Sequence, residues 1–120
     1  MEITNDHLKI FEDYFVAYLK KFGLTDWDIA YKVCDDIDPQ GQISIYSDCR
    51  NALVEINKTL GCNESQINDR LRFLACHEAC HLMLSDIIHI ALSKSITRTA
   101  FDMTKESIAM RLTNLLMEVI

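Results

Sequence analysis

Residues 67–84 read INDRLRFLACHEACHLML, and this stretch predicts one long helix. Its apolar residues recur three and four positions apart, the spacing that gathers side chains on a helical face. Asn63 or Ser65 can cap the start of this helix. Residues 87–92 either continue the helix or begin a separate turn. The apolar set comprises Ile67, Leu71, Leu74, Ala75, Leu82 and Leu84.

A second helix is predicted near the N-terminus, where apolar residues again recur at helical spacing between charged ones. Thr4 or Asn5 can cap its start, and Gly23 can end it. A third helix is expected from about Thr104 to the C-terminus. The apolar residues of this N-terminal helix are Leu8, Phe11, Phe15, Tyr18, Leu19 and Phe22. Those of the C-terminal helix, the third along the chain, are Ile108, Leu112, Leu115, Leu116 and Val119.

Three extended runs lie between the N-terminal helix and the long helix that begins near residue 67. Alternating apolar residues in 27–33 indicate a half-buried strand, and 43–46 and 52–57 are further strand candidates. Residues 35–41 contain the single proline and form the clearest loop. Short connections favour a mainly antiparallel three-stranded sheet. We therefore expect residues 1–120 to form one α+β domain.

The central helix carries His77-Glu78-Ala79-Cys80-His81, the pattern H-E-x-x-H. Residues four apart share one helical face, so His77 and His81 can point at one ion. Zn²⁺ binds imidazole nitrogen readily and lowers the pKa of a bound water from about 15.7 toward 7. Glu78 can reach that water as a general base. The alternative is a helix that carries two histidines and an unrelated glutamate by chance.

A catalytic zinc ion usually has three protein ligands, so a third is expected. We favour Glu106, which lies 25 residues after His81 (106 − 81 = 25) on the third helix. Its spacing from Ala109, Leu112 and Leu116 places it on the inner helical face, where a lone charge is costly without a partner. The other interpretation is a glutamate favoured in a first turn by the helix dipole. Asp86, His89 and Asp102 remain alternative ligands.

Composition and charge limit the cellular compartments and the classes of partner that we expect for this chain. The formal net charge of −6 argues against a nucleic-acid backbone as the main partner. No apolar run approaches the length of about 20 residues that spans a bilayer, and residues 1–6 do not resemble a secretory signal. Five irregularly spaced cysteines suggest reduced thiols and a cytoplasmic protein. Cys76 and Cys80 are expected to pack in the core.

The H-E-A-C-H motif, followed by a glutamate about 25 residues later, resembles the gluzincin type of minimal zincin. The Trp27 strand and the run 54–57 before the motif are similar to those of short phage- or prophage-encoded metallopeptidases. ImmA/IrrE-like and SprT-like metallopeptidases are more distant in plan. The resemblance implies zinc held by His77, His81 and Glu106. It also implies a peptide substrate along an edge strand, which would be residues 52–57 here.

These observations predict a zinc-dependent metallopeptidase in which Glu78 is the general base. The alternative is a catalytically silent, phage-type binding or regulatory protein in which zinc is structural or absent. A protein whose motif is accidental is the third possibility. The substrate and the oligomeric state do not follow from the sequence.

Overall fold

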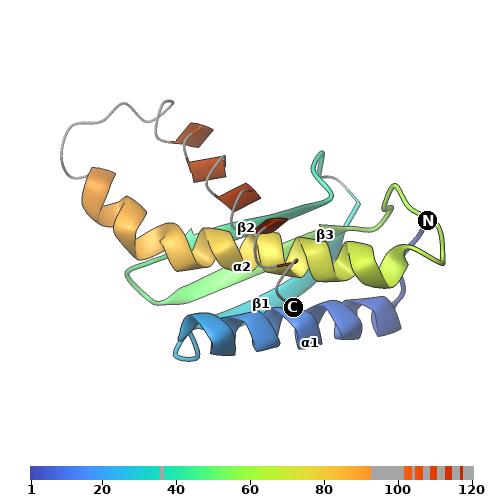
Figure 1. Cartoon of the computed structure of the whole chain (residues 1–120), viewed down its shortest axis with the longest axis horizontal. Coiled ribbons are helices and arrows are strands. Elements are labelled where there is room, and N and C mark those ends of the chain that lie inside the picture. Colours follow the sequence, from blue (N-terminus) through green and yellow to red (C-terminus); the bar gives the residue numbers. More distant parts are fainter. Residues whose placement is uncertain are drawn as a thin grey trace.

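The computed structural model describes residues 1–35 and 37–92, together with residues 102, 103, 105, 106, 109, 110, 113, 114 and 117. For residues 86–92 it describes the helical backbone alone. The elements follow in the order α1 (Asn5–Phe22), β1 (Asp28–Cys34), β2 (Gly41–Tyr46), β3 (Asn51–Asn57) and α2 (Ile67–Leu92). Both helices lie side by side on one face of the sheet, which gives an α+β architecture (Figure 1).

The caps of α1 are those that the sequence predicts. Thr4 accepts a hydrogen bond from the backbone N–H of His7, and the His7 ring accepts one from the N–H of Thr4. At the other end, Gly23 adopts a left-handed conformation with φ of 73°. Glycine has no Cβ, so it takes this conformation without the steric cost that other residues meet. The predicted bounds of this helix are confirmed.

The strands lie where the sequence predicts them, within about two residues, but the sheet is mixed. The strand order is β1-β3-β2, with β3 parallel to β1 and antiparallel to β2. The mainly antiparallel expectation is therefore wrong for one of the two pairings. Short connections favour pairing between consecutive strands, yet β3 lies between β1 and β2. The central strand is the one whose side chains are most buried, because strands on both sides and the helices cover its core-facing residues.

Alternation along β3 separates the two faces of the sheet. Ala52, Val54 and Ile56 face the helices and are buried, and register places apolar residues of β1 and β2 beside them. The opposite face carries Gln42 and Glu55, which are hydrogen-bonded to each other. This period of two is typical of a sheet with one covered face.

Helix α2 continues through Leu92, so residues 87–92 extend it rather than beginning a separate turn. Every residue from 74 to 82 is buried. A helix that is buried on all sides needs covering layers in several directions. The sheet and α1 supply two of them, and the described residues from 102 to 117 supply a third.

The described residues between 102 and 117 are all helical. Helical conformation is present already at Asp102, before the predicted start at Thr104, which lies outside the described residues. In Figure 1 these residues (red) cross α2 and reach toward α1. The Tyr18 hydroxyl donates to Met117 Sδ at 3.4 Å, which ties the far end of this segment to α1. Of the apolar residues predicted for the third helix, Ile108, Leu112, Leu115, Leu116 and Val119 lie outside the described residues.

The buried core joins α1, the helix-facing side of the sheet and α2. The fully buried large side chains include Phe11, Phe15, Val54, Ile56, Leu60, Leu71 and Leu82.

None of the helices within the described part of the chain is long and apolar enough to cross a membrane.

Candidate metal centre

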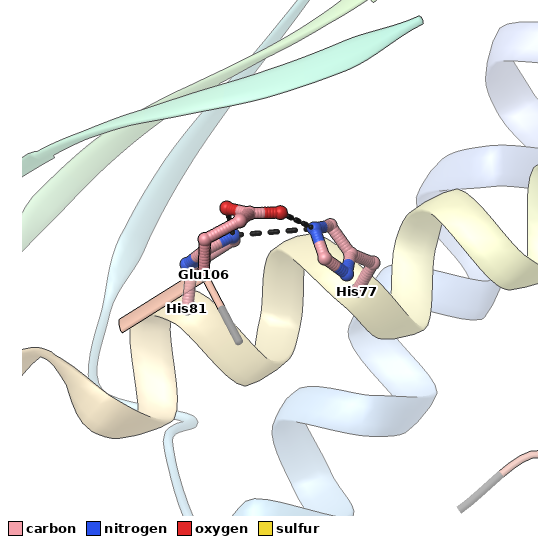
Figure 2. A group of neighbouring side chains, drawn as sticks. All are labelled: His77, His81 and Glu106. Atoms are coloured by element: carbon pink, nitrogen blue, oxygen red, sulfur yellow. Dashed lines mark hydrogen bonds and ion pairs between the residues drawn. The ribbon is translucent and has the colours of Figure 1, made fainter. Parts of the chain in front are cut away.

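His77, His81 and Glu106 point their polar atoms at one another, as Figure 2 shows. Nε2 of His77 lies 2.9 Å from Oε1 of Glu106, and Nε2 of His81 lies 2.9 Å from Oε2. The two Nε2 atoms are 3.3 Å apart. The ligand atoms of the three residues all lie within 4.8 Å of one another. The structure thus brings together the two histidines and the glutamate that the sequence singles out.

The helix sets the positions of the two imidazoles. His77 and His81 are four residues apart, so both project from the same face of α2 about one turn apart. Their ring centroids are 4.8 Å apart and the rings are nearly perpendicular, at 88°. Both side chains are buried. Burial holds the rings in fixed orientations, and only their Nε2 edges converge.

Glu106 reaches this pair from the C-terminal helical residues. Its side chain remains 59% exposed although both carboxylate oxygens contact histidine nitrogens. The helical face is the inner one, since Ala109 and Thr113 on it are buried, but the expected burial of the Glu106 side chain is wrong: it reaches the site from the rim. Asp102, one turn earlier, is exposed and is absent from this cluster. The side chains of Asp86 and His89, the other two alternatives, lie outside the described residues.

The donor set suits zinc. Tetrahedral zinc with bonds of about 2.0–2.1 Å holds neighbouring ligand atoms roughly 3.3 Å apart. The separation of the two Nε2 atoms is 3.3 Å, and each Nε2 is 2.9 Å from a carboxylate oxygen. Four atoms that carry lone pairs therefore converge in a largely buried place. In the structure these atoms are one another's hydrogen-bond or ion-pair partners, and a cation bound between them would replace those contacts.

Thr113 supports the first histidine from behind. Its hydroxyl donates to the carbonyl of Ala109 at 2.7 Å, and its Oγ1 lies 3.3 Å from Nδ1 of His77. A threonine hydroxyl has one hydrogen, so with that hydrogen on Ala109 the oxygen accepts from Nδ1–H. In the neutral ring of His77 the lone pair is then on Nε2, the atom that faces Glu106. Such an outer partner fixes the tautomer and the ring orientation of a metal-binding histidine.

Thr113 is not among the residues that the sequence motif singles out. The signal was its spacing: Thr113 lies seven residues after Glu106, two helical turns later on the same face. One helix thus supplies a candidate ligand and the support for a second candidate ligand. Thr113 is fully buried, as a hydroxyl with two partners can be.

His81 is held neutral by its surroundings. Burial lowers the pKa of His81 to about 4, and the nearby Glu106 charge opposes part of that change. A neutral imidazole keeps a lone pair for a metal ion. Its Nδ1 atom is buried and has no hydrogen-bond partner among the residues that the structure describes.

Glu78 lies beside the three residues without joining them. Its carboxylate faces the start of β2, where a side chain at Gly41 would have its Cβ 3.7 Å from Oε1. The side chain is only 3% exposed. Burial raises the pKa of Glu78 to about 8, and the charge of Glu106 adds to the increase. A carboxyl group with this pKa can both accept and release a proton near neutral pH.

A pocket of about 500 Å³ lies over the cluster. Residues of α2, the loop before β2, β2 itself and the pair Lys105–Glu106 form its walls. Both histidines, Glu78 and Glu106 line it, so the polar cluster is accessible to a ligand. The strand on this wall is β2, an edge of the described sheet, and not β3.

The predicted edge strand at residues 52–57 is therefore wrong. That segment is the central strand β3, and its backbone is paired with β1 and β2 on its two sides. A strand paired on both sides has no free row of donors and acceptors for a peptide. The cysteines of the motif helix lie where the sequence predicts them: Cys76 and Cys80 are fully buried and not in disulfides.

Comparisons with protein-family models, with curated protein sequences and with solved structures find no match for this chain.

Proposed function

We propose that this chain is a zinc-dependent metallopeptidase with a minimal zincin-like domain of the gluzincin type. The observation that carries the proposal is the convergence of His77, His81 and Glu106 in one pocket, with the carboxylate of Glu78 beside them. Two nitrogen ligands and one carboxylate leave a fourth tetrahedral position for water or substrate, which is typical of catalytic zinc sites.

Zinc in this place would supply Lewis-acid chemistry: it polarises a carbonyl group and lowers the pKa of water. His77, His81 and Glu106 would hold the ion through Nε2, Nε2 and the carboxylate. Thr113 would keep His77 in the tautomer that binds through Nε2.

Glu78 accepts and then donates the proton in this reaction. A nearby divalent cation favours its ionised form, since an opposite charge lowers the pKa of a carboxyl group. The ionised carboxylate takes a proton from the attacking water, and the protonated acid then gives it to the leaving amine. Lys105 lines the same pocket, and its positive charge also favours the ionised form of Glu78.

We further propose that the substrate is a peptide segment that lies along β2. This strand has β3 on one side and no other partner within the described part of the chain. Gly41, Gln42, Ile43 and Ile45 of β2 line the pocket. An unpaired edge offers backbone donors and acceptors to an extended peptide, and the site lies next to that edge.

The test compares the zinc-loaded parent with the Glu78→Gln variant on fluorescein-labelled casein and on a mixture of synthetic peptides. We expect the parent to cleave, and the variant to bind one zinc per chain while its cleavage rate falls at least about a hundredfold, the lower range for general-base catalysis. Equal rates would remove Glu78 from catalysis. Tight zinc binding without cleavage by the parent would instead favour the silent, zinc-holding binding protein.

A further inference from the structure

A groove continues from the metal centre toward the start of α2. A second pocket, lined by Gln66, Asp69, Arg70 and Phe73, adjoins the pocket over the cluster. The two pockets share Arg70 and Phe73. An extended ligand that occupies the metal end of the groove can therefore pass over Arg70.

Arg70 is held in place from one side only. Its Nη1 atom donates to Oε1 of Gln40 at 3.3 Å, and the backbone carbonyl of Gln40 accepts from Asn57 of β3 at 2.9 Å. A guanidinium group has five N–H donors, so most of them remain for a ligand. No carboxylate of the described residues forms an ion pair with Arg70. The side chain is half-buried in the groove wall.

Charges are segregated in the larger pocket, whereas the second pocket has the exposed Asp69 beside Arg70. The carboxylates that line the larger pocket are Glu78 and Glu106, and both lie at the candidate metal centre. Lys105 is next to them, whereas Arg70 precedes His77 by two helical turns. The far end of this pocket is thus positive, although the whole chain has a formal charge of −6. A guanidinium group on a groove wall binds carboxylates in a two-bond geometry.

Helical spacing gives the distance between the two ends. Seven residues separate Arg70 from His77, which is about 10 Å along the axis at about 1.5 Å per residue. An extended peptide rises about 3.3 Å per residue, so the same distance covers about three residues.

We propose that Arg70 forms a carboxylate-binding subsite, which selects peptides with a negative charge about three residues from the bond that is cut. The inference rests on the proposed peptidase function and names its substrate class. The carboxylate belongs to an Asp or Glu side chain or to the C-terminus of the peptide; both present the same chemistry to the guanidinium group.

The experiment uses the zinc-loaded full chain and a mixture of synthetic peptides, prepared once with free and once with amidated C-termini. Cleavage sites are read by mass spectrometry. We expect Asp and Glu, or the free C-terminus, to be enriched about three residues from the cut bond. For a matched pair of peptides that differ by Asp→Asn or by amidation there, we expect kcat/KM to differ about tenfold.

The Arg70→Gln variant should reduce this ratio to about one, and Arg70→Lys should keep part of it, because a lysine retains the charge but not the two-bond geometry. Lys32→Gln, a control on the exposed face of β1, changes the net charge equally and should keep the full ratio. Circular dichroism and zinc content verify that the variants fold. An acidic preference that survives in Arg70→Gln, or no preference in the parent, overturns this inference alone. No cleavage by the parent overturns the proposed function and the inference with it.

Discussion

Oγ1 of Thr113 lies 3.3 Å from Nδ1 of His77, on the ring edge opposite the one that faces Glu106. The hydroxyl hydrogen points to the carbonyl of Ala109, so Thr113 accepts from Nδ1–H, and the neutral form of the ring presents the lone pair of Nε2 to the cluster. The C-terminal helical residues thus orient one candidate ligand from behind while Glu106 supplies another from the front.

Replacing Thr113 with valine removes the acceptor and keeps the shape. We expect zinc affinity to fall about 10- to 100-fold, the range for loss of an outer partner of a metal-binding histidine. Competition with a chromophoric chelator measures the change. Thr113→Ser keeps the hydroxyl and should bind zinc nearly as tightly as the parent. Equal affinities for the valine variant and the parent would show that the contact does not position the ring.

Removal of Glu106 tests the third ligand. We expect Glu106→Ala to weaken zinc binding by two orders of magnitude or more, because the site then has two protein ligands instead of three. Asp102→Ala is the matched control: this acid is exposed, on the same helical segment and outside the cluster. Isothermal titration with zinc compares the two. A larger loss in the Asp102 variant would reassign the third ligand.

The buried carboxyl of Glu78 predicts a pH dependence of the metal-free protein. The pKa of Glu78 is raised from 4.5 to about 8 in the folded state, mainly by burial. Because this pKa is raised in the folded state, the contribution of Glu78 to the free energy of unfolding is fully present below pH 4.5. That contribution is lost as the pH rises through about 8. Glutamine does not titrate, so Glu78→Gln should gain stability over the parent between pH 5 and pH 9, by a few kcal/mol in order of magnitude.

Thermal melting in the presence of a chelator measures this difference. The titration of His81 is common to both proteins, so it cancels to first order in the comparison. A stability difference that stays constant from pH 5 to pH 9 would show that Glu78 is not held in its neutral form.

The order of the strands has its own test in hydrogen exchange. Amides of β3 donate to neighbours on both sides, whereas about half of the amides of β2 point away from β3. We expect the β3 amides to exchange slowly throughout, and alternate β2 amides to exchange quickly. Uniformly fast exchange along β3 would contradict the central position.

The buried side chains of β3 predict a loss of stability when one is shortened. Ile56→Ala should destabilise the fold by about 2–5 kcal/mol, as is usual for large core residues.

Local patterns predict local structure well in this chain. Thr4, Gly23 and the apolar spacing define α1 because caps and periodicity act over a few residues. The strand order did not follow from the sequence, since pairing depends on contacts between segments far apart in the chain. Connection length favours consecutive strands, and the burial of Val54 and Ile56 favours β3 in the centre. The strand order of the sheet therefore follows burial and not connection length.

The candidate site shows the same division. His77, Glu78 and His81 are predicted together because one helical turn fixes their spacing. The structure brings Glu106 to the two histidines, as its distance along the chain suggests, but the other reason for the choice, burial, does not hold for a side chain that is 59% exposed. Thr113 and Arg70 were not predicted, because their importance comes from contacts across elements: one with His77 and one with Gln40. The spacing of Thr113 from Glu106 gave only its helical face.

The most direct measurement is a crystal structure of the zinc-soaked full chain with anomalous data on both sides of the zinc absorption edge. We predict one zinc ion bound to Nε2 of His77, Nε2 of His81 and the carboxylate of Glu106, with a fourth position open to solvent. A folded protein whose two imidazoles show no zinc signal between them under these conditions would contradict this prediction.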